Sequence, residues 1–464
     1  MFDRVKNVFI VGIKGAAMVN IALILKKMGK NVTGSDSSEE FITDELLRVN
    51  DISYSSGFEP SNLSSRTEAV VYSAANGGEN NPQIVEAKKR NLKVLHQAAL
   101  IEEIIQQFKT KIAVCGSHGK TTTAALLAYT LSKLGQKPSY LVGAQFGDMW
   151  GGDYQQGDYF VLEADEYAVN PPQDKTPKLN FYHPDYILAL NADLDHPDVY
   201  DSIEQVKSTF LAFFQGKKIY ACCDDENLQD IVRKLPREAY KTFGCSDKAD
   251  LQISNVVANE TSTTFDVTLD SAQAGMTFET QLYGKKNISN IAGVILVLLD
   301  LGFGFEEIKK SIRDFSGAKR RFEKRAFIND TYLFDDYAHH PSEIEASIEA
   351  GRERFPKRRI IVIFQPHTYS RTKMLYSEFG IELEKADQSL IAPIFSSSRE
   401  NPKDFTVTSF DIANGRENIH AYESNEGLML ELEKILKRGD VIFTMGAGDI
   451  YKLEDDIIRI INRL

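Results

Sequence analysis

The chain has 464 residues, too many for one hydrophobic core, so we expect about two to four domains. Its hydrophobic content of 42% and charged content of 26% are ordinary for a folded globular protein. The net charge of −12, from 54 basic and 66 acidic residues, argues against a nucleic acid partner. No apolar run is long enough to insert into a membrane as a helix.

The four cysteines, Cys115, Cys222, Cys223 and Cys245, show neither disulfide nor zinc-ligand spacing. Cys115 has no base partner in the sequence around it, so we expect it to pack in the core. The first residues do not have the pattern of a signal peptide. We therefore expect a cytoplasmic protein, either a monomer or a homodimer.

The first segment, residues 1–108, has the pattern of a parallel α/β domain. After its first strand, an amphipathic helix ends near Met28. The predicted strands cover Asn7–Val11, Asn31–Asp36, Ala69–Ser73 and Leu92–Leu95.

The turn after the first strand, G-I-K-G-A-A-M, is a degraded dinucleotide-binding turn. Gly12 and Gly15 lie in this turn, whereas Lys14 and Ala17 stand where a full fingerprint has glycines. Asp36, at the end of the second strand, lies at roughly the spacing of a ribose-contacting acid. This pattern favours a nucleotide diphosphate over NAD, so a Rossmann dehydrogenase is the weaker alternative.

The second segment, residues 109–318, opens with the most informative motif, I-A-V-C-G-S-H-G-K-T-T-T over residues 112–123. An apolar strand, a turn with two glycines and a helix-forming run follow in the order that points backbone N–H groups at an anion. Lys120 is placed to neutralise phosphate charge, and the Thr121 hydroxyl to bind the Mg²⁺ that accompanies ATP. Val114 stands where the longer P-loop has its first glycine, so this is the shorter variant G-x-x-G-K-T.

Two further apolar strands in this segment end in acids. One is residues 159–166, Y-F-V-L-E-A-D-E, and the other is residues 186–191, which lead into D-L-D-H-P-D. Open α/β sheets build sites at the carboxyl ends of such strands. We therefore prefer a Mg²⁺ role for Glu163 over an exposed strand-end acid, and metal or phosphate binding for His196.

Polar and apolar residues alternate within Leu251–Tyr283, for example in T-F-D-V-T-L over residues 264–269, and this pattern predicts antiparallel hairpins. Asn287 and Asn290 follow, and they either cap a helix or contact the edge of an adenine; their spacing favours capping. Arg320 and Arg321 are either a solvated pair or a phosphate clamp.

The third segment, residues 319–464, repeats βα units. Its predicted strands cover Thr331–Asp335, Ile360–Phe364, Gln388–Pro393 and Asp440–Met445. The run D-D-Y-A-H-H-P, residues 335–341, places two acids and two histidines at a strand end, which indicates a functional loop. Arg371, in Q-P-H-T-Y-S-R-T, is able to hold a carboxylate or a phosphate.

Taken in order, G-S-H-G-K-T-T-T, E-A-D-E, L-D-H-P-D, N-x-x-N, R-R-F, D-D-Y-A-H-H-P and Q-P-H-x-Y-S-R-T resemble the motifs of the Mur ligases of peptidoglycan precursor synthesis. The resemblance spans essentially the whole chain and is greatest to members that add L-alanine to UDP-N-acetylmuramate. It implies an α/β fold of three domains. These are a Rossmann-like UDP-substrate domain, a P-loop ATPase domain with a mostly parallel sheet and a small antiparallel sheet, and a Rossmann-like domain that closes over the site.

The resemblance also implies a reaction and the residues that perform it. Mg²⁺ and ATP convert a substrate carboxylate to an acyl phosphate, which the amine of an amino acid attacks, with release of ADP and phosphate. The implied catalytic residues are Lys120, Glu163, His196, His339 and Arg371. Thr121 and Glu163 would bind one Mg²⁺ and His196 a second.

Binding residues follow from the same resemblance. Those for ATP are Gly116, Ser117, His118, Gly119, Lys120, Thr121, Thr122, Asn287, Asn290, Arg321 and Asp336. Those for the UDP-sugar and the amino acid are Gly12, Gly15, Asp36, Ser73, His196, His339 and Arg371, of which His339 and Arg371 would face the carboxylates.

Several departures keep alternatives open. Lys14 and Ala17 put contacts to the UDP pyrophosphate in doubt, and Thr368 stands where many members carry another arginine. The stretch Ala168–Pro184 is longer than in most alanine-adding members and resembles those that add a recycled tripeptide. The runs T-M-G-A-G-D-I and F-S-S-S-R-E favour alanine addition. A tripeptide ligase is therefore one alternative, and a regulatory P-loop NTPase without ligase activity is another.

Overall fold

The computed structural model describes residues 2–171, 173–196, 198–269, 275–396 and 400–464. Pro197 of the D-L-D-H-P-D run and residues 397–399 of the F-S-S-S-R-E run lie outside these ranges. The chain divides into two compact units. Unit 1 comprises Met1–Asn255, Phe265–Glu279 and Ser289–Phe315, and unit 2 comprises Val256–Thr264, Thr280–Ile288 and Ser316–Leu464. The three predicted domain ranges, 1–108, 109–318 and 319–464, stay a prediction.

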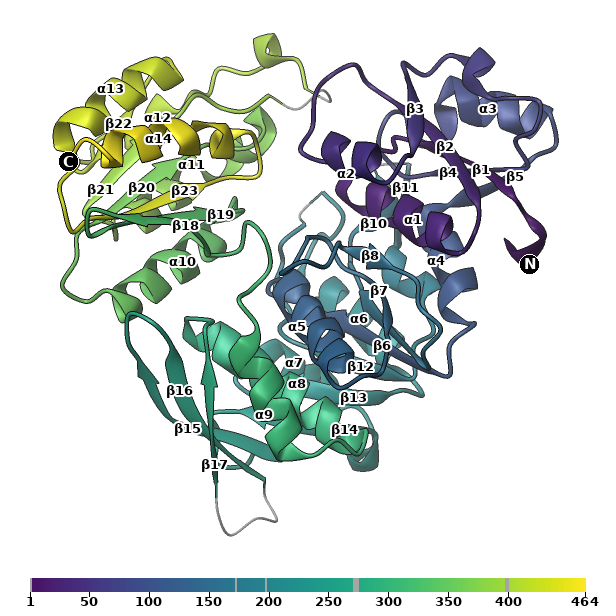
Figure 1. The fold of residues 1–464 in the computed structure, drawn as a ribbon, viewed down its shortest axis with the longest axis horizontal. Helices are drawn as coiled ribbons and strands as arrows, with labels where there is room; N and C mark the ends of the chain where they lie inside the picture. Colours follow the sequence, from purple (N-terminus) through teal and green to yellow (C-terminus); the bar gives the residue numbers. More distant parts are fainter. Residues whose placement is uncertain (1, 172, 197, 270–274, 397–399) are drawn as a thin grey trace. The chain divides into compact units, whose positions relative to one another are not determined.

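The N-terminal part of unit 1 is built on a parallel sheet with the strand order β3-β2-β1-β4-β5 (Figure 1). The strands are β1 (Asn7–Val11), β2 (Asn31–Asp36), β3 (Ser53–Ser56), β4 (Ala69–Tyr72) and β5 (Lys93–His96). The four strands predicted in this segment are present with ends that differ by at most one residue. The near-continuous apolar runs of the two inner strands, β1 and β4, fit a parallel sheet that helices cover on both faces.

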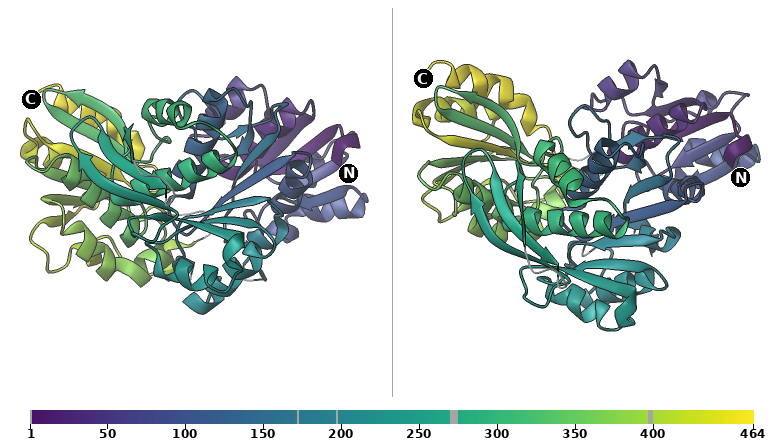
Figure 2. Two further views of the ribbon diagram at one scale, coloured as in Figure 1. Left: turned by 90° about the horizontal axis from the view of Figure 1, so that it is seen from below. Right: turned by 60° about the horizontal axis from the view of Figure 1, so that its bottom comes forward.

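Helices connect these strands, shown in purple in Figure 1 and from two further sides in Figure 2. They are α1 (Ala16–Lys27), α2 (Asp44–Val49), α3 (Pro82–Lys89) and α4 (Gln97–Ile105). Ile84 and Ala87 of α3 pack against Phe9 and Val11 of β1 in a buried cluster. The period-2 alternation of β1 and the helical spacing of α3 bring these side chains together.

A larger sheet of unit 1 has the order β17-β16-β15-β14-β13-β12-β6-β9-β7-β8. Its strands are β6 (Thr110–Cys115), β7 (Ser139–Leu141), β8 (Gly152–Asp153), β9 (Tyr159–Glu163), β12 (Tyr186–Ala189), β13 (Lys218–Cys222), β14 (Tyr240–Gly244), β15 (Leu251–Ala258), β16 (Thr263–Leu269) and β17 (Met276–Thr280). Its middle strands are parallel, with β6 between β9 and β12. A separate antiparallel pair is formed by β10 (Ala168–Asn170) and β11 (Asp174–Pro177).

The helices of this part are α5 (Lys120–Lys133), α6 (Ile203–Phe214), α7 (Glu226–Val232), α8 (Lys285–Asp300) and α9 (Phe305–Asp314). Because β6 lies inside the sheet, its carboxyl end and those of β9 and β12 meet at one edge. That edge is where the sequence places the P-loop, Glu163 and the D-L-D-H-P-D run.

Close contact between α1 and the β7–β8 region joins the two sheets of unit 1. Asn20 of α1 donates a side-chain hydrogen bond to the carbonyl oxygen of Val142 (3.0 Å). A Cβ atom on Gly152 would lie 2.2 Å from the carbonyl oxygen of Asn20, so only glycine permits this approach. The N-terminal sheet is therefore held at a defined place beside the P-loop sheet.

Unit 2 contains a sheet with the order β18-β19-β23-β20-β21-β22. Its strands are β18 (Glu323–Ile328), β19 (Thr331–Asp336), β20 (Ile360–Phe364), β21 (Gln388–Ile391), β22 (Ile419–Ala421) and β23 (Val441–Met445). All neighbouring pairs are parallel except β18 with β19. The predicted strands of the third segment are confirmed, and β18 adds an antiparallel edge.

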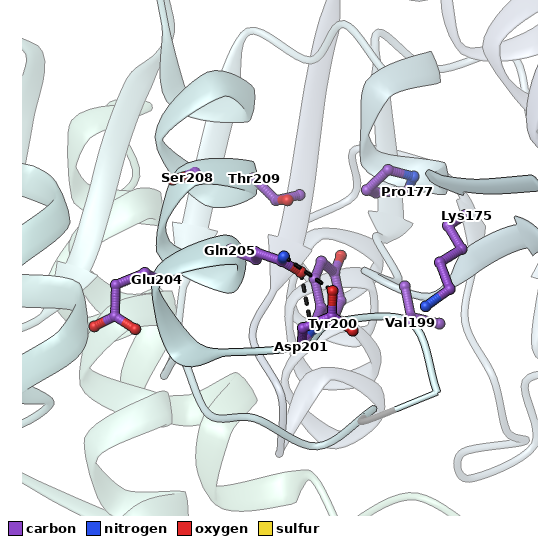
Figure 3. A pocket seen from close by; sticks show the side chains of 9 residues that line it. All are labelled: Lys175, Pro177, Val199, Tyr200, Asp201, Glu204, Gln205, Ser208 and Thr209. Atoms are coloured by element: carbon purple, nitrogen blue, oxygen red, sulfur yellow. Dashed lines mark hydrogen bonds between the residues drawn. The ribbon is translucent and has the colours of Figure 1, made fainter.

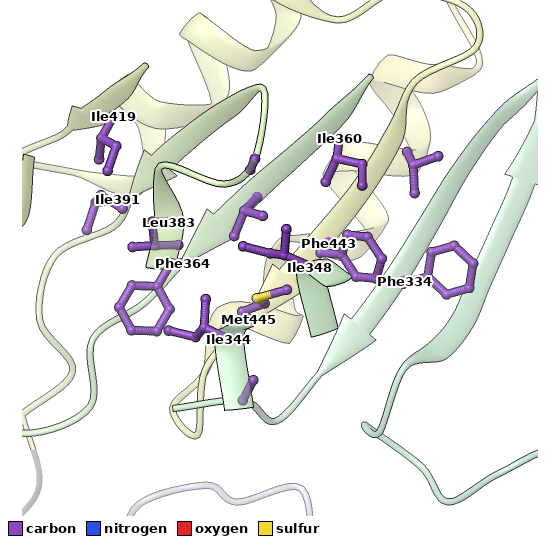
Figure 4. Packing of buried hydrophobic residues seen from close by; sticks show 14 of the residues in the cluster. Phe334, Ile344, Ile348, Ile360, Phe364, Leu383, Ile391, Ile419, Phe443 and Met445 are labelled. Atoms are coloured by element: carbon purple, nitrogen blue, oxygen red, sulfur yellow. The ribbon is translucent and has the colours of Figure 1, made fainter. Parts of the chain in front are cut away.

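Helices cover both faces of this sheet: α10 (Pro341–Arg354), α11 (Tyr369–Leu383), α12 (Phe410–Ala413), α13 (Asn425–Ile435) and α14 (Glu454–Ile461). Alternate residues of β20 face opposite sides, because Ile360, Val362 and Phe364 pack with α10 to α12, as Figure 4 shows for Ile360 and Phe364. The intervening Ile361 and Ile363 pack with α13 and α14. In the described residues, no helix combines the length and apolar character needed to cross a membrane.

Candidate functional site

The phosphate-binding loop has the predicted order of strand, turn and helix. β6 ends at Cys115, and α5 begins at Lys120 with Gly119 as its N-cap in the left-handed region (φ +82°). A Cβ atom on Gly119 would lie 2.5 Å from the side-chain nitrogen of Asn290. The glycine is required both by its backbone conformation and by the close approach of Asn290.

A residue to which the sequence assigned no role, Asn191, clamps this loop. The main-chain N–H of His118 donates to Oδ1 of Asn191 (2.8 Å), and Nδ2 of Asn191 donates to the carbonyl oxygen of His118 (3.0 Å). Ser117 is tied to the same segment, since its hydroxyl donates to the carbonyl oxygen of Asp193 (3.0 Å). The end of β12 therefore shapes the loop, and the only signal in the sequence was a polar residue ending an apolar strand.

Lys120 folds back over the loop. Its Nζ donates to the carbonyl oxygen of Gly116 (2.6 Å) and to Oε2 of Glu166 (2.9 Å). Burial lowers the pKa of Lys120, but the carboxylates of Glu166 and Asp165 outweigh it and raise the pKa above its usual value. Lys120 therefore stays protonated and brings a positive charge to this sheet edge.

Thr121 and Glu163 lie side by side, as a shared magnesium role requires. The Thr121 hydroxyl donates to Oε1 of Glu163 (2.7 Å), and Oε2 of Glu163 accepts the main-chain N–H of Gly143 (2.6 Å). A carboxylate and a hydroxyl at the start of a P-loop helix are hard oxygen ligands that suit Mg²⁺. The residues present therefore fit the ion that accompanies ATP.

His196 belongs to a second group with Asp165 and Glu166. One ligand atom of each of these three residues lies within 4.8 Å of the others, a spacing that suits one metal ion. Nε2 of His196 is 3.6 Å from Oε1 of Glu166, and Glu166 is 2% exposed. His196 is predicted from the sequence, but its partners Asp165 and Glu166 are not, although the run E-A-D-E contains both.

A cavity of about 540 Å³ lies beside this group (Figure 3). It is lined by Lys175, Pro177, Val199, Tyr200, Asp201, Glu204, Gln205, Ser208 and Thr209. The Tyr200 hydroxyl donates to the carbonyl oxygen of Glu166 (2.6 Å), which links the cavity wall to the acidic group. None of the predicted site residues lines this cavity.

Asp36 and Lys14 have structural roles in the N-terminal turn. The two Asp36 carboxylate oxygens accept the main-chain N–H groups of Lys14 (2.7 Å) and Ser37 (2.8 Å), and burial raises the pKa of Asp36. Nζ of Lys14 donates to the carbonyl oxygen of Glu39 (2.7 Å) and lies 3.1 Å from Oδ1 of Asp44. The lysine that departs from the glycine pattern is thus buried and holds the segment that follows β2.

The remaining predicted residues of this region surround the same turn. Gly12 has φ +74°, and a Cβ atom there would lie 2.7 Å from Nδ2 of Asn76. Gly15 is the N-cap of α1, and the Ser73 hydroxyl accepts the main-chain N–H of Ala75 (3.3 Å). All of them lie at the carboxyl ends of β1 and β4.

The polar residues of unit 2 converge at the carboxyl end of β19. Asp336 is buried and accepts from the Ser347 hydroxyl (2.7 Å), and burial raises its pKa to about 6. Nδ1 of His339 lies 2.9 Å from the carbonyl oxygen of Tyr337, and burial lowers the pKa of His339. Glu343, which is not among the residues predicted from the sequence, accepts the main-chain N–H of His339 (3.0 Å).

Two arginines complete this group. Arg321 lies 3.6 Å from Oε1 of Glu343. Arg371 is in the first turn of α11, and its charge contributes to the lowered pKa of His339. Thr368, which replaces a family arginine, is the N-cap of α11 and accepts the main-chain N–H of Arg371 (3.4 Å). Its hydroxyl therefore serves the helix rather than a substrate anion.

The interpretation of Asn287 and Asn290 as helix caps is wrong. Both lie inside α8, which begins at Lys285, so neither occupies the position before the helix that a cap requires. Nδ2 of Asn287 instead donates to the carbonyl oxygen of Tyr283, one turn earlier (2.8 Å). The other interpretation, contact with the nucleotide, agrees with the place of Asn290 against Gly119.

Family descriptions match three consecutive parts of the chain. "Mur ligase family, catalytic domain" matches residues 7–109, "Mur ligase middle domain" matches residues 114–298, and "Mur ligase, glutamate ligase domain" matches residues 320–448.

Relatives match over nearly their full length. A UDP-N-acetylmuramate–L-alanine ligase of Lactobacillus johnsonii is 35% identical over 461 residues, 98% of this chain and 99% of its own. The structure of a UDP-N-acetylmuramate–alanine ligase from Thermotoga maritima superimposes with a TM-score of 0.80 at 23% identity, covering 98% of this chain and 99% of that one. A murein peptide ligase from Psychrobacter arcticus does so with a TM-score of 0.74 at 21% identity, covering 99% of each.

Proposed function

The chain belongs to the Mur ligase family, and we propose that it joins L-alanine to the carboxyl group of UDP-N-acetylmuramate in an ATP-dependent reaction. The observation that carries the proposal is the full-length similarity to a ligase of that name, together with Lys120, Thr121 and Glu163 at one sheet edge. A role as a non-ligating nucleotide switch does not agree with membership of a ligase family.

The reaction begins with two anions that repel each other. An oxygen of the muramyl carboxylate attacks the γ-phosphorus of ATP, the bond from that phosphorus to the bridging oxygen breaks, and ADP leaves. Lys120 offsets the charge that accumulates as the phosphoryl group moves. Thr121 and Glu163 would hold one Mg²⁺, and Asp165, Glu166 and His196 a second. Bound there, such ions would supply further positive charge to the phosphate oxygens.

The second step makes the amide bond. The neutral amine of L-alanine attacks the acyl carbon, the carbon–oxygen bond to phosphate breaks, and the nitrogen loses a proton. His339 and Arg371 are the proposed residues for the carboxylates, since Arg371 is cationic and offers a planar set of donors. Asn287, Asn290, Arg321 and Asp336 are the proposed contacts for ATP in addition to the loop. Gly12, Gly15, Asp36 and Ser73 are those proposed for the UDP-sugar.

The proposal is tested by phosphate release with Mg²⁺, ATP and UDP-N-acetylmuramate, measured separately with L-alanine, L-serine, glycine and the murein tripeptide. We expect L-alanine to stimulate release most strongly, with an amide product of matching mass. Stimulation by the tripeptide alone would assign the chain to the peptide-adding ligases. No stimulation by any of the four would overturn ligase activity on this acceptor.

A further inference from the structure

Two lysines already neutralise the acidic group of Asp165, Glu166 and His196. Nζ of Lys120 lies 2.9 and 3.2 Å from the two carboxylate oxygens of Glu166. Nζ of Lys178 lies 2.7 Å from Oδ2 of Asp165. Each acid of the group therefore has an ammonium partner within hydrogen-bond distance.

These ion pairs conflict with a divalent cation at the same place. The three ligand atoms lie within 4.8 Å of one another, so an ion among them would sit close to both ammonium groups. Like charges at such separations repel strongly where water is partly excluded, and Glu166 is only 2% exposed. A divalent cation and both lysines cannot all occupy these carboxylates favourably.

The two lysines differ in what surrounds them, because only Lys120 belongs to the phosphate-binding loop. The main-chain N–H of Lys178 donates to the carbonyl oxygen of Tyr167 (3.0 Å), and its Nζ lies 5.5 Å from the centre of the Tyr167 ring. The other partners of Lys120 are the loop carbonyl oxygens of Gly116 (2.6 Å) and Ser117 (3.1 Å). Nucleotide phosphates bring further full negative charges to this same loop, where Lys120 otherwise has the single carboxylate charge of Glu166 and neutral carbonyl groups.

We propose that Lys120 occupies the cation position beside Glu166 in the nucleotide-free protein, and that a divalent cation enters the group only after nucleotide phosphates draw Lys120 away. Lys178 remains beside Asp165 throughout and limits the affinity of the group. Nucleotide and the second metal ion therefore bind synergistically, and the metal binds poorly first. The inference rests on the proposed function only in taking ATP as the nucleotide.

Electron paramagnetic resonance of free Mn²⁺ measures the affinity of the nucleotide-free protein directly. Wild-type protein should bind Mn²⁺ weakly, and Lys120→Met should bind it at least about tenfold more tightly, because removal of the ammonium leaves Glu166 uncompensated. Lys178→Met should also bind more tightly. Lys207→Met is the matched control, since Lys207 makes a 2.8 Å ion pair with Asp230 and has no contact with the group.

The double variant Lys120→Met with Glu166→Gln tests whether Mn²⁺ binds at Glu166. It should lose the Mn²⁺ affinity that Lys120→Met alone gains. Circular dichroism establishes that each variant is folded, and Lys120→Gln replaces Lys120→Met if the latter is not. Unchanged or weaker Mn²⁺ binding by the folded Lys120 variant would overturn the inference, whatever the result for Lys178→Met. The titration contains no UDP-sugar or amino acid, so its outcome is separate from that of the phosphate-release assay.

Discussion

At the scale of the residue, the pKa values of Lys120 and Asp336 are both raised, with opposite consequences for the charge of the two side chains. The Asp336 side chain is buried and that of Lys120 is 12% exposed, and Lys120 forms a 2.9 Å ion pair with Glu166. The pKa of Lys120 is therefore raised by Glu166, which favours its charged form, whereas burial raises the pKa of Asp336, which favours its neutral form. The two side chains should respond to pH in different ways.

Asp336 makes the protein less stable as pH rises. Its pKa is about 6 in the folded protein against 3.8 ordinarily, so its stabilising contribution is present below about pH 4 and is lost as pH rises through about 6. We expect Asp336→Asn to remove this part of the pH dependence. Calorimetric melting temperatures from pH 4 to 8 should therefore fall less in the variant than in wild type.

The amide oxygen of asparagine is able to accept the main-chain N–H of Ala338, as Oδ1 of Asp336 does (3.0 Å), and the amide nitrogen to donate to the Ser347 hydroxyl, so both contacts remain and only the charge is removed. An equal fall of melting temperature in both proteins would contradict the assignment of a raised pKa to Asp336.

At the scale of the element, the P-loop is the clearest agreement between sequence and structure. Its Gly116, Gly119 and Lys120 are predicted by spacing because a strand, a turn and a helix N-terminus are all local structures. Asn191, which holds the loop through His118, is 73 residues away from His118 in the chain, so no local sequence pattern predicts this contact. The same holds for Glu166 beside Lys120, at a separation of 46 residues.

Asn191→Ala should weaken nucleotide binding. The change removes both hydrogen bonds to His118, each worth about 1 kcal/mol, and frees the loop to leave its anion-binding conformation. We expect about a tenfold rise in the dissociation constant of ADP by isothermal titration calorimetry.

Asn227→Ala is the matched control, because Asn227 donates to the carbonyl oxygen of Ala192 (2.7 Å) and makes no contact with the loop. Equal losses of affinity in the two variants would show that Asn191 acts through general stability rather than through the loop.

At the scale of the whole molecule, the chain folds as two compact units, and the boundary passes through the first turn of α8. Asn287 falls in unit 2 and Asn290 in unit 1, although they are three residues apart. Within unit 1, the N-terminal sheet is tied to the P-loop sheet through Asn20 and Gly152. This packing makes the two sheets one unit.

Gly152→Ala should destabilise unit 1. The added Cβ atom would lie 2.2 Å from the carbonyl oxygen of Asn20, which is inside α1, while Gly152 is paired with Leu141 of β7, so relief of the overlap would disturb a helix or a strand pair. We expect a loss of about 1–3 kcal/mol, seen as a lower melting temperature.

Gly304→Ala provides the control. Gly304 has φ −79°, and the nearest atom to an added Cβ is 3.4 Å away, so the substitution meets no close contact and costs only the preference for glycine over alanine at the N-cap of α9. A Gly152→Ala melting temperature as high as that of Gly304→Ala would contradict the close approach of α1.

The amino-acid sequence alone determined the parallel strands, the P-loop and the ordered motifs of a Mur ligase, because hydrophobic periodicity and glycine spacing act over a few residues. It identified Lys120, Thr121, Glu163 and His196 as chemistry-bearing side chains. Only the tertiary structure decided their partners: Asn191 for the loop, Glu166 for Lys120 and Lys178 for Asp165. Such pairings depend on which strand ends the sheet order brings together. Asn287 and Asn290 are not the caps that the sequence favours, because sequence spacing does not locate the first residue of a helix.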